Sequence, residues 1–265
     1  MINQKIARWK SLIGEALLVP FYSTRKKLAY KYLRGNGLEI GALHHPLEVS
    51  PGVTVSYVDY VSREGNITKF KGINGSAIVV TDHLDDGFEL SGIPPDSQDF
   101  IIANHLLEHS PNPLQVLINW DRVLKTNGIL YLTLPNGHKS FDKGRPITPI
   151  SHMVEDFNLM RNGAMAECNT RNREHFREFV EISIPNLHVV HRNLKVHKTE
   201  AEKNAYIDKL AGINSSDAHY HVFSTASFVE FINHAVTHHL KKFHLIEIVS
   251  SRGDKEFIAI IQKTN

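Results

Sequence analysis

Several features that would assign a class at once are missing from this sequence. Cys168 is the single cysteine, which excludes a disulfide framework and a cysteine-based zinc site. No apolar run approaches the ~18–20 residues of a membrane span. The first residues, MINQKIARWK, lack the charged region, apolar core and cleavage site of a signal peptide. These absences predict a soluble, cytoplasmic protein with no membrane partner.

An excess of charge is missing too. The chain has 30 lysines and arginines against 28 acidic residues, so bulk electrostatics gives no reason to expect a nucleic-acid partner. What is present is enough apolar material for one large domain, with 42% hydrophobic residues in a chain of 265. The anomaly is histidine: there are 17, and twelve of them follow from His138 onward.

Short β-rich segments alternate with helical ones from residue 38 to residue 135. The β-rich segments are 38–42, 53–60, 76–82, 99–104 and 129–135, and residues 111–128 carry apolar residues at helical spacing. Such alternation predicts a parallel sheet covered on both faces. Two further β-rich segments, 243–251 and 256–263, are separated by a loop short enough only for an antiparallel hairpin. The predicted fold is α/β: a Rossmann-like, doubly wound, mostly parallel seven-stranded sheet with an antiparallel C-terminal hairpin strand.

The remaining segments predict additions to this sheet. Residues 1–36 form a helical N-terminal cap, since apolar residues recur there every three or four positions. Residues 37–136 and 222–265 form the core. Residues 137–221 form an insertion, in which a helix is expected to begin near Pro149. An insertion of this size predicts a lid around an acceptor.

Ligands of open α/β sheets bind beyond the carboxyl ends of the strands, so the residues after each predicted strand matter most. Asp59 follows the second strand, and one carboxylate can accept hydrogen bonds from both hydroxyls of a ribose. The first strand leads into LEIGALHHP, which has Gly41 but no further glycine. A nicotinamide dinucleotide site needs G-x-G-x-x-G there, so a nicotinamide-dependent oxidoreductase is excluded.

The run DSQDFIIANHLLEHSPNPLQVLINWDRVLKTNGILYLTLPN resembles class I S-adenosylmethionine-dependent methyltransferases, in particular their small-molecule branch. Its pattern is N-H-x-L-E-H, then a helix ending R-V-L-K-x-x-G, then an apolar strand ending in proline. The resemblance covers residues 37–136, and the terminal hairpin fits it. It implies S-adenosyl-L-methionine as cofactor and places Glu108 and His109 at the start of the following helix. The implied cofactor-binding residues are Glu39 and Gly41 in the first loop with Ala42 and His44 beside them, Asp59 at the ribose, Asp82 and His83 at the adenine, and Asn104 and His105 at the methionyl end.

The insertion supplies the candidates for acceptor chemistry. His152 and Asp156 are four residues apart on one face of a predicted helix, where the carboxylate can orient the imidazole as a general base. His219 and His221 lie on the same side of an extended segment. Arg145 can bind an anionic group of the acceptor.

The expected reaction is methyl transfer to an oxygen of a small molecule, with nitrogen as the second choice. The segment FDKGRPITPISHMVEDF is similar to methyltransferases of bacterial surface-glycan pathways, which suggests a sugar or a phosphate-bearing precursor as acceptor.

Three alternatives stay open. The histidines can be structural or surface residues; the fold can be a catalytically silent scaffold; or the chain can be a histidine-rich metal-binding protein. No H-E-x-x-H or similarly specific spacing occurs, so the sequence predicts no metal site. Neither the acceptor nor the oligomeric state follows from the sequence.

Overall fold

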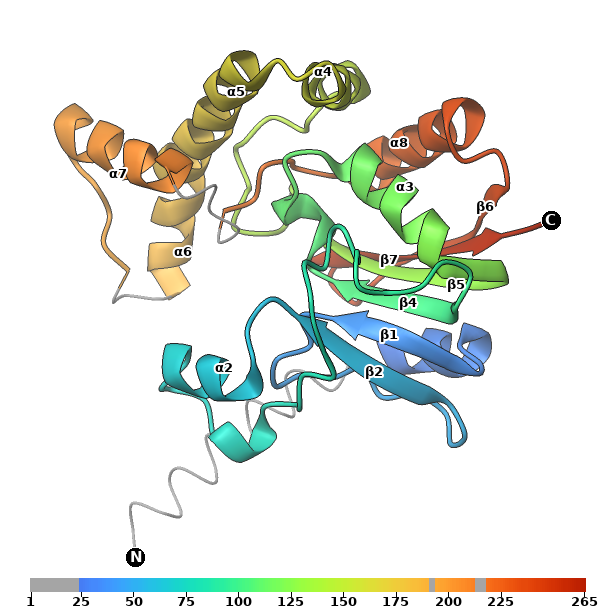
Figure 1. Cartoon of the computed structure of the whole chain (residues 1–265). Coiled ribbons are helices and arrows are strands. Elements are labelled where there is room, and N and C mark those ends of the chain that lie inside the picture. Colours follow the sequence, from blue (N-terminus) through green and yellow to red (C-terminus); the bar gives the residue numbers. More distant parts are fainter. Residues whose placement is uncertain (1–23, 191–193, 213–217) are drawn as a thin grey trace, which may run out of the picture.

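The computed structural model describes residues 24–190, 194–212 and 218–265 (Figure 1). At its centre lies a seven-stranded sheet in the order β3-β2-β1-β4-β5-β7-β6. The strands are β1 (Asn36–Ile40), β2 (Thr54–Asp59), β3 (His83–Leu84), β4 (Gln98–Asn104), β5 (Leu124–Pro135), β6 (Phe243–Ser250) and β7 (Glu256–Lys263). The first five pair in parallel, and β7 runs antiparallel to both β5 and β6. The predicted fold class is confirmed.

The position of β7 separates this sheet from the dinucleotide-binding fold. That fold has the order 3-2-1-4-5-6, and its last strand joins in parallel. Here β7 lies between β5 and β6 and returns antiparallel, because only five residues separate the end of β6 from its start. The hairpin predicted from the sequence therefore becomes one edge of the sheet.

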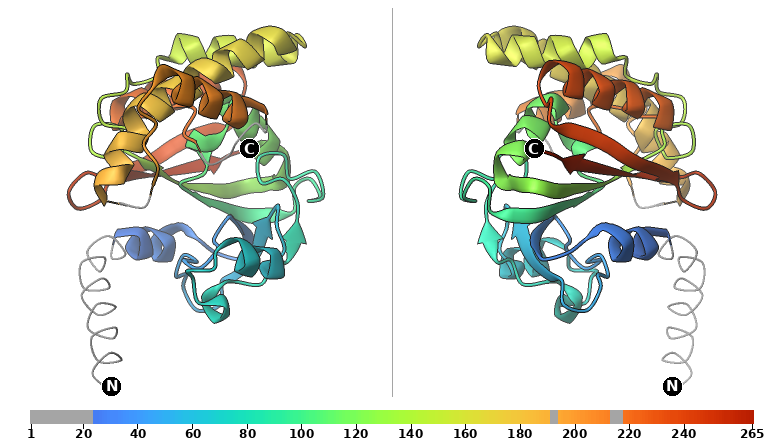
Figure 2. Two further views of the ribbon diagram at one scale, coloured as in Figure 1. Left: turned by 90° about the vertical axis from the view of Figure 1, so that its left-hand side faces the viewer. Right: turned by 90° about the vertical axis from the view of Figure 1, so that its right-hand side faces the viewer.

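Helices cover both faces of the sheet (Figure 2). On one face lie α3 (Pro113–Val123), α4 (Ile150–Arg161) and α8 (Thr225–His238), whose apolar residues share one core with β1, β4, β5 and β7. Trp120 of α3 is completely buried there. On the other face helical residues 24–32 place Leu28 and Leu33 against Phe100 and Tyr131.

The insertion has a core of its own. It contains α5 (Met165–Glu178), a π-helical segment (Phe179–Ser183), α6 (Ile184–Val190) and α7 (Glu200–Gly212). Phe176, Ile184 and Ile207 pack there with Tyr220 of the segment that returns to the sheet. In Figure 1 these helices and α2 (Arg63–Lys69) lie on the side to which β1, β2 and β4 point. The carboxyl ends of the strands therefore face the insertion.

The buried strand predicted over residues 76–82 is wrong. A short 3-10 helix (Gly75–Ala77) occupies its first residues, Val80 is 62% exposed, and β3 begins only at His83. The backbone explains this difference: the N–H of Val79 donates to the carbonyl oxygen of Leu43, at 2.8 Å, instead of joining a ladder with β2. The segment therefore supports the loop after β1.

Other predicted boundaries fall differently or lie outside the described residues. The helix expected over 111–128 ends at Val123, because β5 already begins at Leu124. The first predicted helix of the cap lies mainly within residues 1–23, which the structure does not describe. Among the described helices, none combines the length and the apolar character needed to cross a membrane.

Candidate active site

Two adjoining cavities lie at the carboxyl ends of β1, β2 and β4. The first cavity has a volume of about 760 Å³ and the second about 710 Å³. Gly41, Leu43 and His105 line both. A ligand can therefore extend from one cavity into the other across the loop after β1 and the end of β4.

The first cavity suits a nucleoside. Asp59 lies on its wall at the end of β2, held by the N–H of Val61 at 3.0 Å and by Asn66 Nδ2 at 2.9 Å. Each carboxylate oxygen keeps a second lone pair that can accept from a hydroxyl group. Tyr60 and Phe88 line the same cavity and offer flat apolar surfaces to a base.

Hydrogen bonds between Glu39 and Leu47 fix the loop that follows β1. Both carboxylate oxygens of Glu39 lie 3.0 Å from the N–H of Leu47, and Asn104 Nδ2 donates to Oε1 at 3.1 Å. Burial raises the pKa of Glu39 to about 7. Gly41 has φ +67°, a conformation that favours glycine, and a Cβ added there meets no atom within 4 Å. The single glycine therefore turns the chain at the cavity, while Glu39 replaces the missing glycines in fixing the loop.

The neighbouring loop residues face the second cavity. Ala42, His44 and His45 line it, and the two imidazole rings lie with their centroids 3.8 Å apart. Asn104 also lines this cavity. Its amide is fixed between Glu39 and the hydroxyl of Thr133, which donates to Asn104 Oδ1 at 2.7 Å.

The two residues predicted at the adenine lie elsewhere. The Asp82 carboxylate accepts from the N–H of Tyr57 at 2.8 Å, and neither Asp82 nor His83 lines a cavity. Because residues 76–82 do not form a strand, the chain reaches the carboxyl edge later than the sequence suggests. Asp86 lines the first cavity instead.

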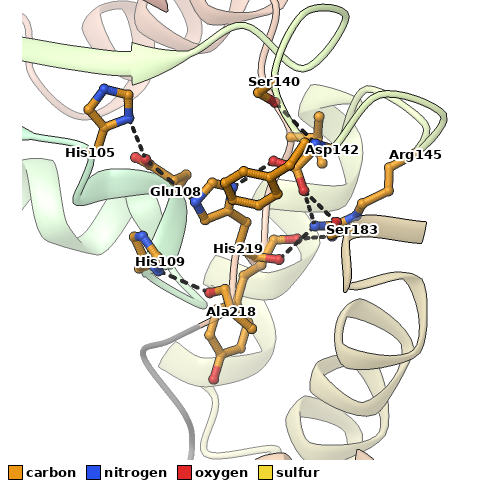
Figure 3. A network of polar contacts seen from close by, with 12 residues as sticks. His105, Glu108, His109, Ser140, Asp142, Arg145, Ser183, Ala218 and His219 are labelled. Carbon is orange, nitrogen blue, oxygen red and sulfur yellow. Dashed lines mark hydrogen bonds and ion pairs between the residues drawn. The ribbon is translucent and has the colours of Figure 1, made fainter. Parts of the chain in front are cut away.

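A network of charged side chains includes His105 and His219, which line the second cavity (Figure 3). His105 Nε2 lies 2.8 Å from Glu256 Oε2, and its Nδ1 lies 3.5 Å from Glu108 Oε1. Burial opposes its protonation, but these two carboxylates raise the pKa of His105 to about 9. Arg25 pairs with the same Glu256, so the start of β7 joins the cap to the site.

Glu108 is completely buried at the centre of the network. Neither carboxylate oxygen has a well-formed hydrogen bond among the described residues, and the surrounding groups are imidazoles: His105 at 3.5 Å and His219 Nε2 at 3.9 Å. Burial favours the protonated acid, but the imidazoles of His105, His219 and His109 outweigh it and lower the pKa of Glu108. The site thus holds a buried carboxylate near any ligand in the second cavity.

His219 and Asp142 form a dyad on the wall of this cavity. His219 Nδ1 lies 2.6 Å from Asp142 Oδ2, and Asp142 Oδ1 accepts from Ser183 Oγ at 2.6 Å and Arg145 Nη1 at 3.0 Å (Figure 3). Burial opposes ionisation, but His219 and Arg145 lower the pKa of Asp142 to about 2. The carboxylate therefore fixes the proton of His219 on Nδ1 and leaves Nε2 to accept one.

The other predicted acceptor residues do not line either cavity. The Arg145 side chain is inaccessible and binds Asp142, Glu178 and the carbonyl oxygens of residues 219 and 220. It positions the dyad and offers no donor to a ligand, which corrects the prediction of an anion-binding residue. His152, Asp156 and His221 gather in a separate cluster outside the cavities.

Sequence reasoning missed Asp142 and the burial of Glu108, while Asp86 was open as a substitute for Asp82. Glu108 stands in the N-H-L-L-E-H pattern, but it lies in a 3-10 turn (Leu107–His109) before α3 rather than at a helix start. Asp142 lies in an irregular segment, where no periodicity signals which side chains turn inward. The acid at Asp142 and the histidine at 219 are far apart in sequence, so only the tertiary fold pairs them.

Comparison with known families decides the chemistry of this pair of cavities. Residues 37–132 match the family model described as a methyltransferase domain. The match assigns a methyltransferase domain to this part of the chain, with S-adenosylmethionine as its cofactor. The residues present fit that cofactor: the first cavity carries Asp59 on its wall, and Gly41, with open space where a Cβ would lie, joins it to the second cavity.

Individual relatives are remote. No curated protein matches the sequence. A candidate S-adenosylmethionine-dependent methyltransferase from Listeria monocytogenes is 10% identical over 93% of this chain and 99% of its own, with a TM-score of 0.49. A methyltransferase from Aquifex aeolicus is 11% identical over 88% of this chain and 85% of its own, with a TM-score of 0.44. A protein from Rhodobacter sphaeroides named for Zn-dependent alcohol dehydrogenases is 14% identical over 88% of this chain and 86% of its own, with a TM-score of 0.48. The fold assignment above therefore rests on the sheet order.

Proposed function

We propose that this methyltransferase acts on a hydroxyl oxygen of a small molecule in the second cavity, with nitrogen as the second choice. The observation that carries the proposal is the His219–Asp142 dyad on the wall of that cavity. A hydroxyl group must lose its proton as it becomes a methyl ether. An amine acceptor uses its own lone pair, so an imidazole held by a carboxylate favours oxygen.

The residues on the cavity walls each bind a different part of the cofactor in this proposal. Asp59 binds the ribose hydroxyls, Asp86 contacts the adenine in place of the predicted Asp82, and Gly41 lets the cofactor pass between the cavities. Asn104 and His105 lie beside the methionyl end. Support comes from their positions on the cavity walls at consecutive strand ends.

S-adenosylmethionine supplies an activated methyl group, so the chain has to position the acceptor and accept its proton. Positioning of this kind supplies on the order of 7–11 kcal/mol. His219 Nε2 takes the proton, which adds a factor of roughly 10²–10⁴. Asp142 holds the imidazole in the required tautomer, and the Glu108 carboxylate, 3.9 Å from Nε2, stabilises the imidazolium that forms.

The lining of the second cavity favours an acceptor with an anionic group. Lys139 and Lys255 line it, and Arg25, which pairs with Glu256, lies on the same wall. Cationic side chains of this kind bind phosphate or carboxylate. The acceptor we propose is therefore a sugar or a phosphate-bearing sugar precursor, of the type used for surface glycans.

The test has two stages, so that loss of cofactor binding and loss of transfer are separable. S-adenosylhomocysteine at about 100 times its dissociation constant should raise the unfolding free energy by ~2.7 kcal/mol. Transfer of a radiolabelled methyl group is then measured into sugars, sugar phosphates, nucleotide sugars and amines. Labelling of a sugar phosphate that is abolished in His219→Gln supports the proposal. Cofactor binding with no acceptor labelled in any class indicates a catalytically silent scaffold.

A further inference from the structure

Three histidines and one aspartate meet outside the active site, where the insertion joins the core. His152 and Asp156 lie on α4, His175 lies on α5, and His221 lies on the segment that returns to the sheet. None of the four lines either cavity. His221 is completely buried, and His175 and Asp156 are 5% and 7% exposed. The cluster therefore serves neither cofactor nor acceptor.

Three of the side chains bring ligand atoms together, and His221 lies beside them. His152 Nε2 lies 3.2 Å from His175 Nε2 and 3.4 Å from Asp156 Oδ2, and the Nε2 atoms of His175 and His221 each lie 3.9 Å from the same Oδ2. Ligand atoms of a tetrahedral zinc ion, at about 2.0–2.2 Å from the metal, lie about 3.4 Å from one another. The spacings among His152, Asp156 and His175 are close to that geometry. His221 Nε2 also lies 3.4 Å from the carbonyl oxygen of Pro111, so this ring has to turn away from that oxygen to become the fourth ligand.

Arginine contacts fix the orientation of the Asp156 carboxylate. Arg171 binds Oδ1 and the carbonyl oxygen of His152, so the carboxylate cannot rotate freely. Oδ2 is buried, points at the imidazoles and has no well-formed hydrogen bond among the described residues. A buried oxygen without such a bond is costly unless a cation binds it.

Three imidazoles and one carboxylate make up the ligand set. Nitrogen-rich, compact sites select zinc over magnesium or calcium, which prefer oxygen ligands.

We propose that His152, Asp156, His175 and His221 bind a structural zinc ion. Four protein ligands, three of them buried and none on the wall of either cavity, make the site structural rather than catalytic. Its bonds join α4 and α5 to the segment that carries His219, two residues before His221. The ion thus fixes the insertion, and with it the general base, relative to the sheet.

The first measurement is the metal content of the untagged, full-length chain, purified without chelator, by inductively coupled plasma mass spectrometry. We expect about one zinc ion per chain. X-ray absorption should show nitrogen and oxygen neighbours at about 2.0–2.2 Å and no sulfur shell. Both measurements use the unaltered protein, so they do not depend on a variant that folds.

The second measurement locates the ion. His175→Asn and His221→Asn should lose the zinc, and a chelator should lower the melting temperature of the unaltered chain but not of these variants. The matched control is His238→Asn, because His234 and His238 form an exposed pair, with ring centroids 4.4 Å apart, that can bind zinc adventitiously. This control should keep the zinc. Absence of zinc even after titration, a sulfur shell, or loss of zinc only in His238→Asn would overturn the proposal.

Discussion

Replacement of Asp142 by asparagine tests the centre of the proposed mechanism. The carboxylate is 1% exposed and binds Ser183, Arg145 and His219 at 2.6, 3.0 and 2.6 Å. Its removal leaves the buried Arg145 guanidinium with Glu178 as its remaining charged partner, at 3.3 Å. Breaking a buried pair in this way costs about 3–5 kcal/mol. The lowered pKa of Asp142 gives a stabilisation of the same order, since a fall from 3.8 to about 2 corresponds to about 2 kcal/mol.

We therefore expect Asp142→Asn to lose between about 2 and 5 kcal/mol of unfolding free energy at pH 7. In a chain of this size the melting temperature falls by about 2–4 °C per kcal/mol. The matched control is Ser183→Ala, which removes one hydrogen bond to the same carboxylate and no charge, at a cost of about 1 kcal/mol. Circular dichroism melts of the three proteins measure the difference.

The pH dependence gives an independent check. The folded-state pKa of Asp142 lies below its unfolded value, so its contribution is complete above about 3.8 and is lost as the pH falls toward 2. The difference in unfolding free energy between Asp142→Asn and the unaltered chain should become smaller as the pH falls from 3.8 to about 2. A cost at pH 7 no larger than that of Ser183→Ala, or a gap that does not change with pH, would refute the reasoning.

Three further outcomes follow from the cavities. Asp59→Asn should weaken S-adenosylhomocysteine binding by about 10–100-fold in calorimetry, because one charge-assisted hydrogen bond is lost; unchanged affinity would remove the ribose role. Gly41→Ala should destabilise the chain by about 1–2 kcal/mol, because alanine is strained at the positive φ of this position. It should also weaken cofactor binding, since the added Cβ enters open cavity space. Cofactor affinity equal to that of the unaltered chain would contradict the role of Gly41. The pKa of His105 is raised to about 9, so its stabilising contribution is complete below 6.5 and is lost as the pH rises through 9. His105→Gln should flatten that decline in melts between pH 6 and 10, and an unaltered decline would show that another group titrates.

The periodic segments were predictable because each follows a local rule. Short apolar runs define β1, β4 and β5, and alternation defines β2. The short loop after β6 allows only a hairpin, whatever the rest of the chain does. The failure at residues 76–82 has an opposite cause. Val79 and Val80 satisfy the pattern of a buried strand, yet a backbone hydrogen bond to Leu43 uses the segment to support a loop. A contact between distant residues outweighed a local propensity there.

The cofactor-binding residues were easier to predict from the sequence than the acceptor-binding residues, because they follow a local rule. Gly41 and Asp59 directly follow strands of the parallel sheet, and parallel strands bring their carboxyl ends together by construction. Arg145, His152 and His221 lie in the insertion, where no sheet fixes direction. Their place in the same insertion as His219 suggested one acceptor site, but Arg145 is buried beneath the dyad and His221 turns toward Asp156.

The sequence by itself determined the sheet, the hairpin at its edge and the loop with one glycine that is compatible with S-adenosylmethionine. These are consequences of short-range patterns and of chain length between strands. Only the tertiary structure decided what the histidines do. Asp142 meets His219, and His175 meets Asp156, across long stretches of chain. Charged neighbours then lower the pKa of both carboxylates against the effect of burial, and these influences act through space and not along the sequence.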